Sequence, residues 1–513
     1  MKYPIGIQGF EKIRKEGYVY VDKTAYVYKM VTEGNYYFLS RPRRFGKSLM
    51  ISTLEAYFKG KKELFEGLAI AEMEKDWKVY PVLHLDLNTE KYSDLAALNG
   101  ILDVALANWE GLYGKSSVEK TISSRFMGVI CRAYEKTGMR VVILVDEYDK
   151  PMLQAIGNEA LQTEYRNTLK AFYGALKTCD PYIQFAFLTG VTKFGKVSVF
   201  SDLNNLQDMS MLPQYVGICG ITEDELPQYF DSSMEDVALA NGMAKEECYA
   251  KMKEMYDGYH FRQNTIGVYN PFSVLNTFQN KVFDAYWFET GTPTFLVELL
   301  KKHKYSLEKM EQVQTTADVL NSIDSMSDNP IPVIYQAGYL TITGYDARFK
   351  LYKLGFPNKE VEEGFMQYLL PFYCSYSSVD APFQVSQFVR EVEAGDTESF
   401  LLRLKSFFAD TPYELVKDLE NHYQNVLFIL FKLCGFYVKA EYHTSAGRID
   451  MVLETDQYVY VMEFKLDGSA EEAMEQIERK DYPLPFVANG KQLVKIGLNF
   501  SNETRNIDKW IVA

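Results

Sequence analysis

The sequence predicts an α/β protein with a largely parallel sheet in its first half, a helical middle region and a second α/β domain at its C-terminus. Three observations support this fold class. The 513 residues are enough for two to four domains. Short apolar runs alternate with helical stretches before residue 190, which is typical of parallel sheets. Near the C-terminus, two alternating segments between helical patterns predict a hairpin.

Composition and charge limit the possible classes of protein. Hydrophobic residues make up 47% and charged residues 24%, as in folded soluble domains. No stretch approaches the roughly 18 to 20 apolar residues of a membrane helix, the first residues lack a signal-peptide pattern, and the six cysteines are scattered. We therefore expect a cytoplasmic protein of bacterial type without a membrane partner. The net charge of −14 means that nucleic-acid binding would need a local basic patch or a bound metal.

The first half contains a candidate phosphate-binding loop. Four apolar runs predict buried strands of one sheet with helices on both faces: Tyr36–Ser40, Pro81–Leu87, Val141–Val145 and Ile183–Leu188. Gly46, Lys47 and Ser48 follow the first run and open a predicted helix that extends to about Lys59. Free N–H groups at a helix N-terminus favour phosphate, so this position suits a nucleotide.

The loop lacks the usual first glycine, because Arg41 stands in its place. Pro42 can preset the turn through its fixed φ, and the next two arginines can add charge-assisted contacts to phosphates or to a partner. The candidate nucleotide-binding residues of the loop are Arg43, Arg44, Phe45, Gly46, Lys47, Ser48 and Leu49. Lys47 would contact the β- and γ-phosphates.

Carboxylates at the end of a later strand complete the candidate site. Asp146 follows five apolar residues and would hold Mg²⁺ with Ser48, while Glu147 would polarise an attacking water. Thr189, at the end of the next strand, would contact the γ-phosphate or that water. The alternative is a chance Gly-Lys-Ser and a merely solvated strand end. The two signals in this order favour a site for ATP and Mg²⁺.

The loop and the acidic strand end resemble a known family. Arg41–Ser48 (RPRRFGKS) with Val145–Asp149 (VDEYD) is similar to the AAA-ATPase-like family, which is often joined to a C-terminal nuclease-like domain. Four further segments resemble the same family: Tyr20–Thr24, Thr189–Leu206, Tyr256–Phe261 and Tyr286–Gly291. The resemblance implies a P-loop, AAA-like ATPase domain in which an arginine-bearing loop is normal. For Tyr256–Phe261 we expect packing of a helical lid against this domain, with a direct substrate role as the alternative.

The C-terminal hairpin brings acidic residues together. If Asp456 and Gln457 form its turn, Asp450 stands directly opposite Glu463, and opposed residues share a face of the sheet. Lys465, two residues after Glu463, lies on the same face. Two adjacent carboxylates repel unless a cation or proton separates them, and Mg²⁺ accepts such oxygen ligands. We therefore predict a metal site in which Lys465 assists phosphodiester hydrolysis.

An Asp…Glu-x-Lys hairpin followed by a helix resembles the PD-(D/E)xK nuclease superfamily. Ser469 opens that helix with a predicted capping box, and Gln476 would point back at the site. Leu419–Leu433 is similar to the opening helix of the superfamily, in which Glu420 would be an extra acidic residue. Ile449 stands where the proline of the family name would be. The alternative is a structural hairpin with exposed charges.

Together these observations predict four regions and two activities. The regions are a P-loop AAA-like ATPase domain at 1–215, a helical lid at 216–345, a connecting region at 346–400 and a restriction-endonuclease-like domain at 401–513. The favoured function is ATP hydrolysis that controls a metal-dependent nuclease acting on DNA or RNA. The alternative is a nucleotide-switched interaction protein whose C-terminal fold recognises nucleic acid or protein without cutting. A third and less favoured hypothesis is an oligomeric remodelling ATPase in which the C-terminal part serves as an adaptor. A homo-oligomer is compatible with the first two functions as well.

Overall fold

The computed structural model describes the chain except residues 194–199, 201–202, 204, 290–293, 322–328, 375–379, 410–418, 436–438, 446–447 and 481. At 289, 294–295, 298, 302, 311–312, 419–420, 439–445, 448–450, 485 and 488–489 it describes the backbone and not the side chains. The chain divides into two compact units, which are taken separately below. The N-terminal unit comprises Met1–Thr290 and Val313–Glu360, and the C-terminal unit comprises Gly291–Gln312 and Val361–Ala513.

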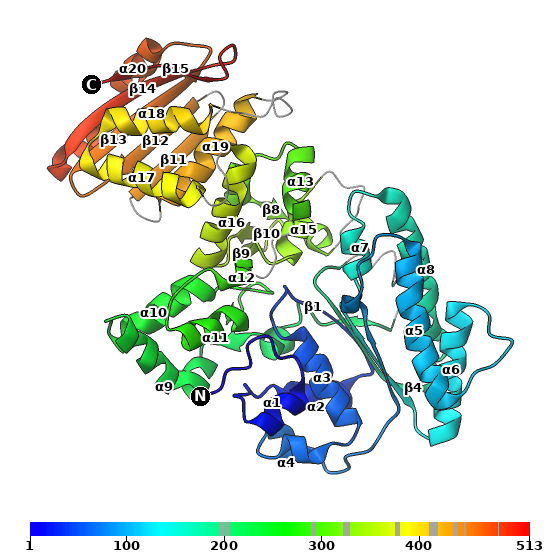
Figure 1. The fold of residues 1–513 in the computed structure, drawn as a ribbon. Coiled ribbons are helices and arrows are strands. Elements are labelled where there is room, and N and C mark those ends of the chain that lie inside the picture. Colours follow the sequence, from blue (N-terminus) through cyan, green and yellow to red (C-terminus); the bar gives the residue numbers. More distant parts are fainter. Residues whose placement is uncertain are drawn as a thin grey trace. The chain divides into compact units, whose positions relative to one another are not determined.

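A five-stranded parallel sheet forms the centre of the N-terminal unit (Figure 1). Its order is β2-β3-β4-β1-β5, and the strands are β1 (Tyr36–Ser40), β2 (Val82–Asp86), β3 (Val141–Asp146), β4 (Ile183–Gly190) and β5 (Gln207–Asp208). Every residue of β1 and β3 is buried, as expected for strands covered on both faces. The parallel sheet and four of its strands are therefore confirmed. Because all five strands are parallel, their carboxyl ends meet at one edge.

Helices cover both faces of this sheet. In Figure 1, α3 lies on one side of the sheet and the layer of α5, α6 and α8 on the other. The helices up to β4 are α1 (Phe10–Glu16), α2 (Thr24–Glu33), α3 (Lys47–Phe58), α4 (Ala69–Met73), α5 (Leu95–Tyr113), α6 (Ile122–Thr137), α7 (Lys150–Gln154) and α8 (Glu159–Thr178). The predicted helix after the loop is thus confirmed as α3. Local signals fix several ends: Thr121 and Ser124 form a capping box at the start of α6.

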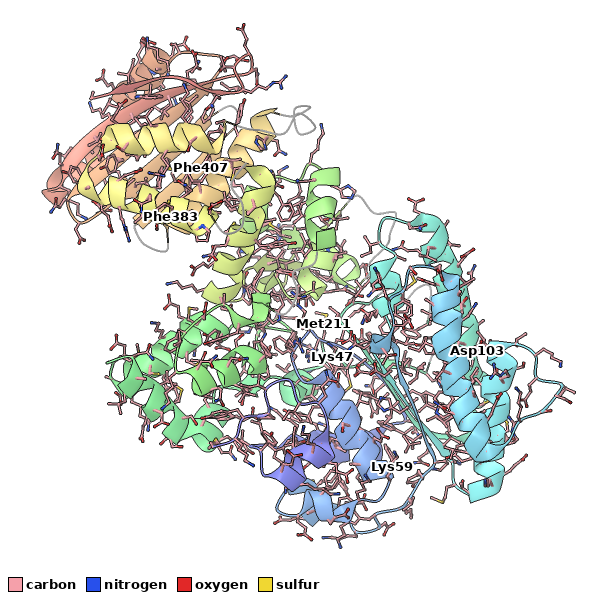
Figure 2. All side chains as sticks on the ribbon, in the orientation of Figure 1. Lys47, Lys59, Asp103, Met211, Phe383 and Phe407 are labelled. Carbon is pink, nitrogen blue, oxygen red and sulfur yellow. The ribbon has the colours of Figure 1, made fainter. Side chains whose placement is uncertain are left out.

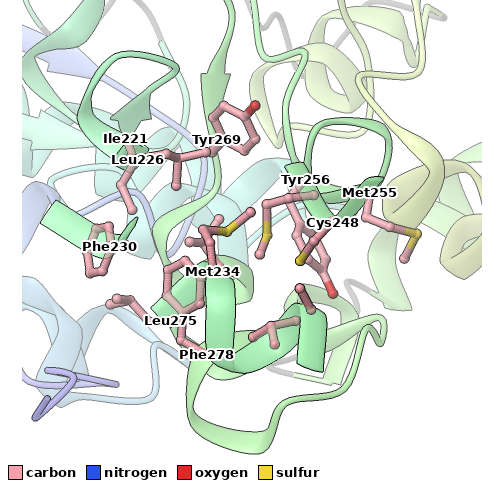
Figure 3. Close-up of a cluster of buried hydrophobic side chains, with 14 residues drawn as sticks. Ile221, Leu226, Phe230, Met234, Cys248, Met255, Tyr256, Tyr269, Leu275 and Phe278 are labelled. Carbon is pink, nitrogen blue, oxygen red and sulfur yellow. The ribbon is translucent and has the colours of Figure 1, made fainter. Parts of the chain in front are cut away.

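A small helical bundle follows the sheet. It consists of α9 (Glu225–Ala240), α10 (Lys245–Tyr256) and α11 (Pro271–Asn280). Leu226, Phe230, Leu275 and Phe278 belong to its apolar core (Figure 3). The N-terminal segment is tied to the bundle, because the Tyr3 hydroxyl hydrogen-bonds the Ser233 hydroxyl at 2.7 Å.

Short elements complete the N-terminal unit. They are β6 (Ile221–Thr222), β7 (Val268–Tyr269), α12 (Tyr286–Glu289), β8 (Gln314–Thr315), α14 (Ala317–Leu320), α15 (Ile331–Gln336), β9 (Thr341–Asp346) and β10 (Leu351–Gly355). β6 pairs with β7, and β10 lies between β8 and β9 in a second small sheet.

The C-terminal unit is built on a mixed five-stranded sheet in the order β11-β12-β13-β14-β15. The strands are β11 (Lys439–Ser445), β12 (Arg448–Glu454), β13 (Tyr458–Leu466), β14 (Gln492–Ser501) and β15 (Asn506–Val512). The helices are α13 (Thr294–Lys302), α16 (Lys359–Tyr373, which starts in the N-terminal unit), α17 (Ala381–Ala394), α18 (Thr397–Phe407), α19 (Leu419–Cys434) and α20 (Ala470–Arg479). α20 connects the parallel pair β13 and β14 and packs on both strands.

Strand β13 alternates between two environments. Val459 and Val461 pack with Ile477 of α20. Tyr460, between them, faces the opposite layer: its ring lies 5.3 Å from that of Phe400 in α18. The period of two therefore places Glu463 and Lys465 on the face covered by α20. The bounds of the four regions expected from the sequence stay predictions.

Candidate functional sites

The candidate phosphate loop lies between β1 and α3. Gly46 immediately precedes α3 with φ of +95°, a conformation that favours glycine. The ammonium nitrogen of Lys47 (Figure 2) lies 3.2 Å from the carbonyl oxygens of both Arg41 and Pro42. It also lies 3.4 Å from Glu147 Oε1. The ammonium group is therefore held inside the curve of the loop.

Arg41, which replaces the usual glycine, is a structural residue. Its side chain is buried, and Nη1 donates to the carbonyls of Ser40 (2.9 Å) and Ser210 (2.8 Å). Nη2 donates to the carbonyl of Tyr215 at 3.2 Å, and the ring of Phe261 lies 3.8 Å from the guanidinium. Burial lowers the pKa of Arg41 to about 10. The side chain thus points away from a phosphate and braces the loop against the end of the sheet.

The other loop side chains have different surroundings. Phe45 is buried, with its ring 4.8 Å from that of Tyr259 and 5.7 Å from that of Phe261. This confirms that Tyr256–Phe261 packs against the loop. Arg44 is exposed and has φ of +68°. Arg43 is half-buried over the ring of Trp287, 5.0 Å from its centroid. Any phosphate contact of Phe45 would use its backbone.

The acidic residues meet at the carboxyl ends of β3 and β4. The hydroxyl of Thr189 donates to Asp146 Oδ1 at 2.6 Å, and the backbone N–H of Glu147 donates to the same oxygen at 3.1 Å. Asp146 and Thr189 are buried. Glu147 has φ of +52°, a strained value for a residue with a side chain. Ser48 occupies the second position of α3.

Asp149 organises this edge of the sheet, although no role was predicted for it. Its carboxylate accepts from the backbone N–H and the hydroxyl of Thr192, at 2.6 and 2.5 Å. Burial, and secondarily the charge of Glu147, raises the pKa of Asp149 to about 7. A Cβ on Gly190 would lie 2.4 Å from Asp149 Oδ1, so only glycine fits there. The available signal was the second aspartate of VDEYD, although its partner Thr192 lies 43 residues away.

A half-open pocket adjoins the loop. It is lined by Gly46 and Leu49, by the segment before β1 that includes Val19 and Val21, and by residues next to the helical bundle such as Ile221. Most of this lining is apolar, with the exception of Lys23 and Thr53 among others. A flat apolar group joined to a phosphate chain suits this place.

The C-terminal hairpin has the predicted register. Asp450 pairs with Glu463, and the Thr455 N–H donates to the Tyr458 carbonyl at 2.9 Å across the predicted turn. The side chain of Asp450 lies outside the described residues, as does that of Glu420 on α19. The backbone therefore confirms that Asp450 and Glu463 stand opposite each other.

Three side chains of the predicted site converge. Lys465 Nζ lies 3.0 Å from Glu463 Oε1 and 2.7 Å from Gln476 Oε1. The Gln476 amide also donates to Glu463 Oε1. Glu463 is fully buried and Gln476 nearly so. The predicted capping box of Ser469 and Glu472 is present at the start of α20, and it directs the helix so that Gln476 reaches the hairpin.

Comparisons with known proteins agree with this architecture. A family model described as predicted AAA-ATPase matches residues 4–200, and a model of the PD-(D/E)XK nuclease superfamily matches residues 418–510. The protein called "Uncharacterized protein in vnfD 5'region", from Azotobacter chroococcum mcd 1, is 35% identical over 525 residues. The similarity covers 100% of this chain and 98% of that relative.

The chain belongs to this family, which joins an AAA-ATPase-like domain to a PD-(D/E)XK nuclease-superfamily domain. In this family member the matched ranges contain the loop, the ends of β3 and β4, and the hairpin with α20. No helix in the described ranges has the length and apolar character needed to span a bilayer.

One further residue near the candidate site of the PD-(D/E)XK domain, Tyr482, was not predicted from the sequence. The Tyr482 hydroxyl lies 3.5 Å from Gln476 Nε2 and 3.0 Å from Lys480 Nζ. It therefore adds a polar group beside the cluster of Glu463, Lys465 and Gln476. The sequence signal was weak, because Tyr482 follows the end of α20 in a turn-rich segment.

The donor chemistry of both sites suits Mg²⁺ better than a softer metal. The groups on offer are the Asp146 carboxylate with the Ser48 hydroxyl, and Glu463 with Asp450 opposite it in the sheet. Among the described side chains, no cluster of three or more His, Cys, Asp or Glu residues could hold a metal alone. A bound Mg²⁺ would therefore also need water or substrate phosphate as ligands, as is usual for Mg²⁺ in proteins.

Proposed function

We propose that the AAA-ATPase-like domain binds and hydrolyses ATP with Mg²⁺, and that its nucleotide state controls a Mg²⁺-dependent nuclease in the PD-(D/E)XK domain. One observation carries the first half of the proposal. The Lys47 ammonium, the Glu147 carboxylate and the Thr189–Asp146 pair gather where a loop, a helix N-terminus and two strand ends meet. That is the place where a triphosphate is favoured electrostatically.

Each residue has a defined task in ATP hydrolysis. Lys47 would exchange its contacts with the Arg41 and Pro42 carbonyls for oxygens of the β- and γ-phosphates. Asp146, oriented by the Thr189 hydroxyl, and Ser48 would hold Mg²⁺, which neutralises phosphate charge when bound. Glu147 would accept a hydrogen bond from the attacking water and hold it in line. The apolar cavity beside Gly46 would take the base.

The nuclease half rests on the convergence of Glu463, Lys465 and Gln476. Asp450 and Glu463 would hold Mg²⁺, which polarises the phosphodiester when bound. Lys465, fixed between Glu463 and Gln476, would position the attacking water or stabilise the charge that develops on the phosphate. The substrate class is DNA or RNA.

A second candidate function is recognition without cleavage. The net charge of −14 favours it, because an acidic chain attracts nucleic acid weakly. In that case the nuclease-like domain would bind its partner under nucleotide control, and the cluster at Lys465 would be structural.

Phosphate release from ATP by the full chain in Mg²⁺ tests the first half. We expect turnover in wild type and at least tenfold weaker ATP binding in Lys47→Ala, because a hydrogen bond to a charged group contributes about 1.5–3 kcal/mol. The matched control is Lys59→Ala, just past the other end of α3, where the ammonium pairs with Glu55. Unchanged ATP binding and turnover in Lys47→Ala would contradict the assignment of the ATP site to this loop.

Cleavage of a mixed DNA and RNA substrate with Mg²⁺ or Mn²⁺ tests the second half. Asp450→Ala and Lys465→Ala should each abolish cleavage while ATP turnover remains. No cleavage by wild type under any of these conditions would favour the recognition function instead.

A further inference from the structure

The phosphate loop is held from outside by residues far along the chain. Trp287 Nε1 donates to the carbonyl oxygen of Arg43 at 3.1 Å, and Arg43 Nη2 donates to the hydroxyl of Tyr339 at 3.2 Å. Gly338 approaches so closely that a Cβ there would lie 2.6 Å from Pro42 Cβ. A shift of the loop backbone must therefore displace Trp287 or the segment around Gly338.

Trp287 is connected in turn to Glu360. The backbone N–H of Trp287 donates to Glu360 Oε1 at 2.7 Å, and the Ser273 hydroxyl lies 2.8 Å from both oxygens of this carboxyl group. Trp287 and Glu360 are both fully buried. When one partner of a buried hydrogen bond is removed, the fold bears the full desolvation cost of the group left unsatisfied. Breaking these contacts is therefore unfavourable.

Glu360 stands at a division of the fold. It is the second residue of α16, and the boundary between the two units falls between Glu360 and Val361. The contacts from Arg43 through Trp287 to Glu360 all lie within the N-terminal unit. They end on the helix whose remaining turns belong to the C-terminal unit.

We propose that Trp287 and Glu360 are positioning residues that transmit nucleotide occupancy of the loop to helix α16. This inference rests on the proposed function, because it requires the loop to bind ATP. Phosphate oxygens would draw the Lys47 ammonium from the carbonyls of Arg41 and Pro42, which releases the backbone just before Arg43. The Arg43 carbonyl then moves, and Trp287 carries that movement to Glu360. Regulation of the C-terminal unit would begin at this contact.

Hydrogen exchange of the full chain with and without ATP and Mg²⁺ tests the proposal. In wild type, ATP should slow exchange in peptides that cover the loop and change exchange in peptides that cover α16. Trp287→Phe keeps an aromatic ring and removes the indole N–H together with one ring of the indole, and Glu360→Ala removes the carboxyl group. In both variants we expect the loop to respond to ATP and the response of α16 to be lost.

Two matched variants separate transmission from general damage. Glu360→Gln keeps an acceptor for the Trp287 N–H and should keep the response of α16. Trp109→Phe changes the same residue type in α5, where Trp109 stacks on Phe126, and should behave as wild type. A loop response with an unaltered α16 response in both Trp287→Phe and Glu360→Ala would overturn the inference alone. No ATP response of the wild-type loop would overturn the proposed function and the inference together.

Discussion

The ammonium nitrogen of Lys47 lies 3.4 Å from a carboxylate oxygen of Glu147, across the gap between the phosphate loop and the end of β3. Both side chains are largely shielded from water, with exposed fractions of 3% and 19%. The strained backbone of Glu147, at φ of +52°, persists because the surrounding contacts fix it. A cation and a base candidate are thus placed side by side before any phosphate binds between them.

Glu147→Gln should separate ATP binding from ATP hydrolysis. The amide keeps the shape of the side chain and removes its capacity to take a proton, so turnover should fall by about 10²- to 10⁴-fold. ATP affinity should stay within a few-fold of wild type. Calorimetric titration and phosphate release measure the two quantities, with Glu159→Gln at the start of α8 as the control. Turnover close to wild type would remove Glu147 from the mechanism.

Thr189→Val should impair hydrolysis without removing a charge. The methyl group fills the space of the hydroxyl, so Asp146 loses the donor that lies at 2.6 Å. An unsatisfied buried acceptor costs about 1–3 kcal/mol, which corresponds to roughly a 5- to 150-fold loss of turnover if Mg²⁺ binding bears that cost. Thr189→Ser restores the hydroxyl and should recover most activity. Equal activity of the Val and Ser variants would contradict this role.

Gly497→Ala should displace α20 from the sheet. A Cβ at this position would lie 2.5 Å from the Ala470 carbonyl oxygen and 2.9 Å from the Met474 backbone nitrogen. Overpacking of this kind costs about 1–3 kcal/mol. Because Gly497 pairs with Glu463, the contact of Gln476 with Glu463 should weaken as well. We expect a lower unfolding temperature of the C-terminal unit and reduced cleavage, while Gly174→Ala in open space on α8 should be nearly neutral.

Stability of the N-terminal unit should depend on the ionisation of Glu360. Burial raises its pKa from 4.5 to about 8, with a smaller contribution from the charge of Asp284. Because the folded pKa is raised, the stabilising contribution of Glu360 is complete below about pH 4.5 and is lost as the pH rises through about 8. The glutamine variant does not titrate. Its stability relative to wild type should therefore increase between pH 5 and pH 8.5.

Thermal unfolding at these two pH values, followed through exchange of peptides from the N-terminal unit, measures that difference. Glu110→Gln is an informative control. The hydrogen bond from Arg125 lowers the pKa of Glu110, so its stabilising contribution is lost only as the pH falls below about 4.5. The difference between Glu110→Gln and wild type should stay constant from pH 5 to pH 8.5. A constant difference for Glu360→Gln as well would contradict the prediction.

The sequence predicts those features that depend on local pattern. β1 and β3 are apolar runs that end in a single polar residue, and strands buried on both faces require such runs. The pairing of Asp450 with Glu463 follows from an alternating pattern and a two-residue turn. The strand β5 has two residues and no distinctive composition, so nothing in the sequence indicated it.

Long-range contacts explain what the sequence did not reveal. Arg41 stands where the usual loop has a glycine, and its acceptors at Ser210 and Tyr215 lie 169 and 174 residues away. Trp287 and Arg43 are 244 residues apart. Contacts between residues so far apart in the sequence do not appear in any local pattern. The residue type does not reveal them either, because arginine and tryptophan occur both in structural contacts and in binding sites.

The most direct test of ATP control is the rate of nucleic-acid cleavage by the full chain in Mg²⁺, measured with and without ATP. It compares wild type with Lys47→Ala, Asp450→Ala and Lys465→Ala. We predict that wild type cleaves at a rate that ATP changes, that Lys47→Ala cleaves at a rate indifferent to ATP, and that the other two do not cleave. Cleavage that survives both Asp450→Ala and Lys465→Ala, or an ATP effect that survives Lys47→Ala, would contradict the account.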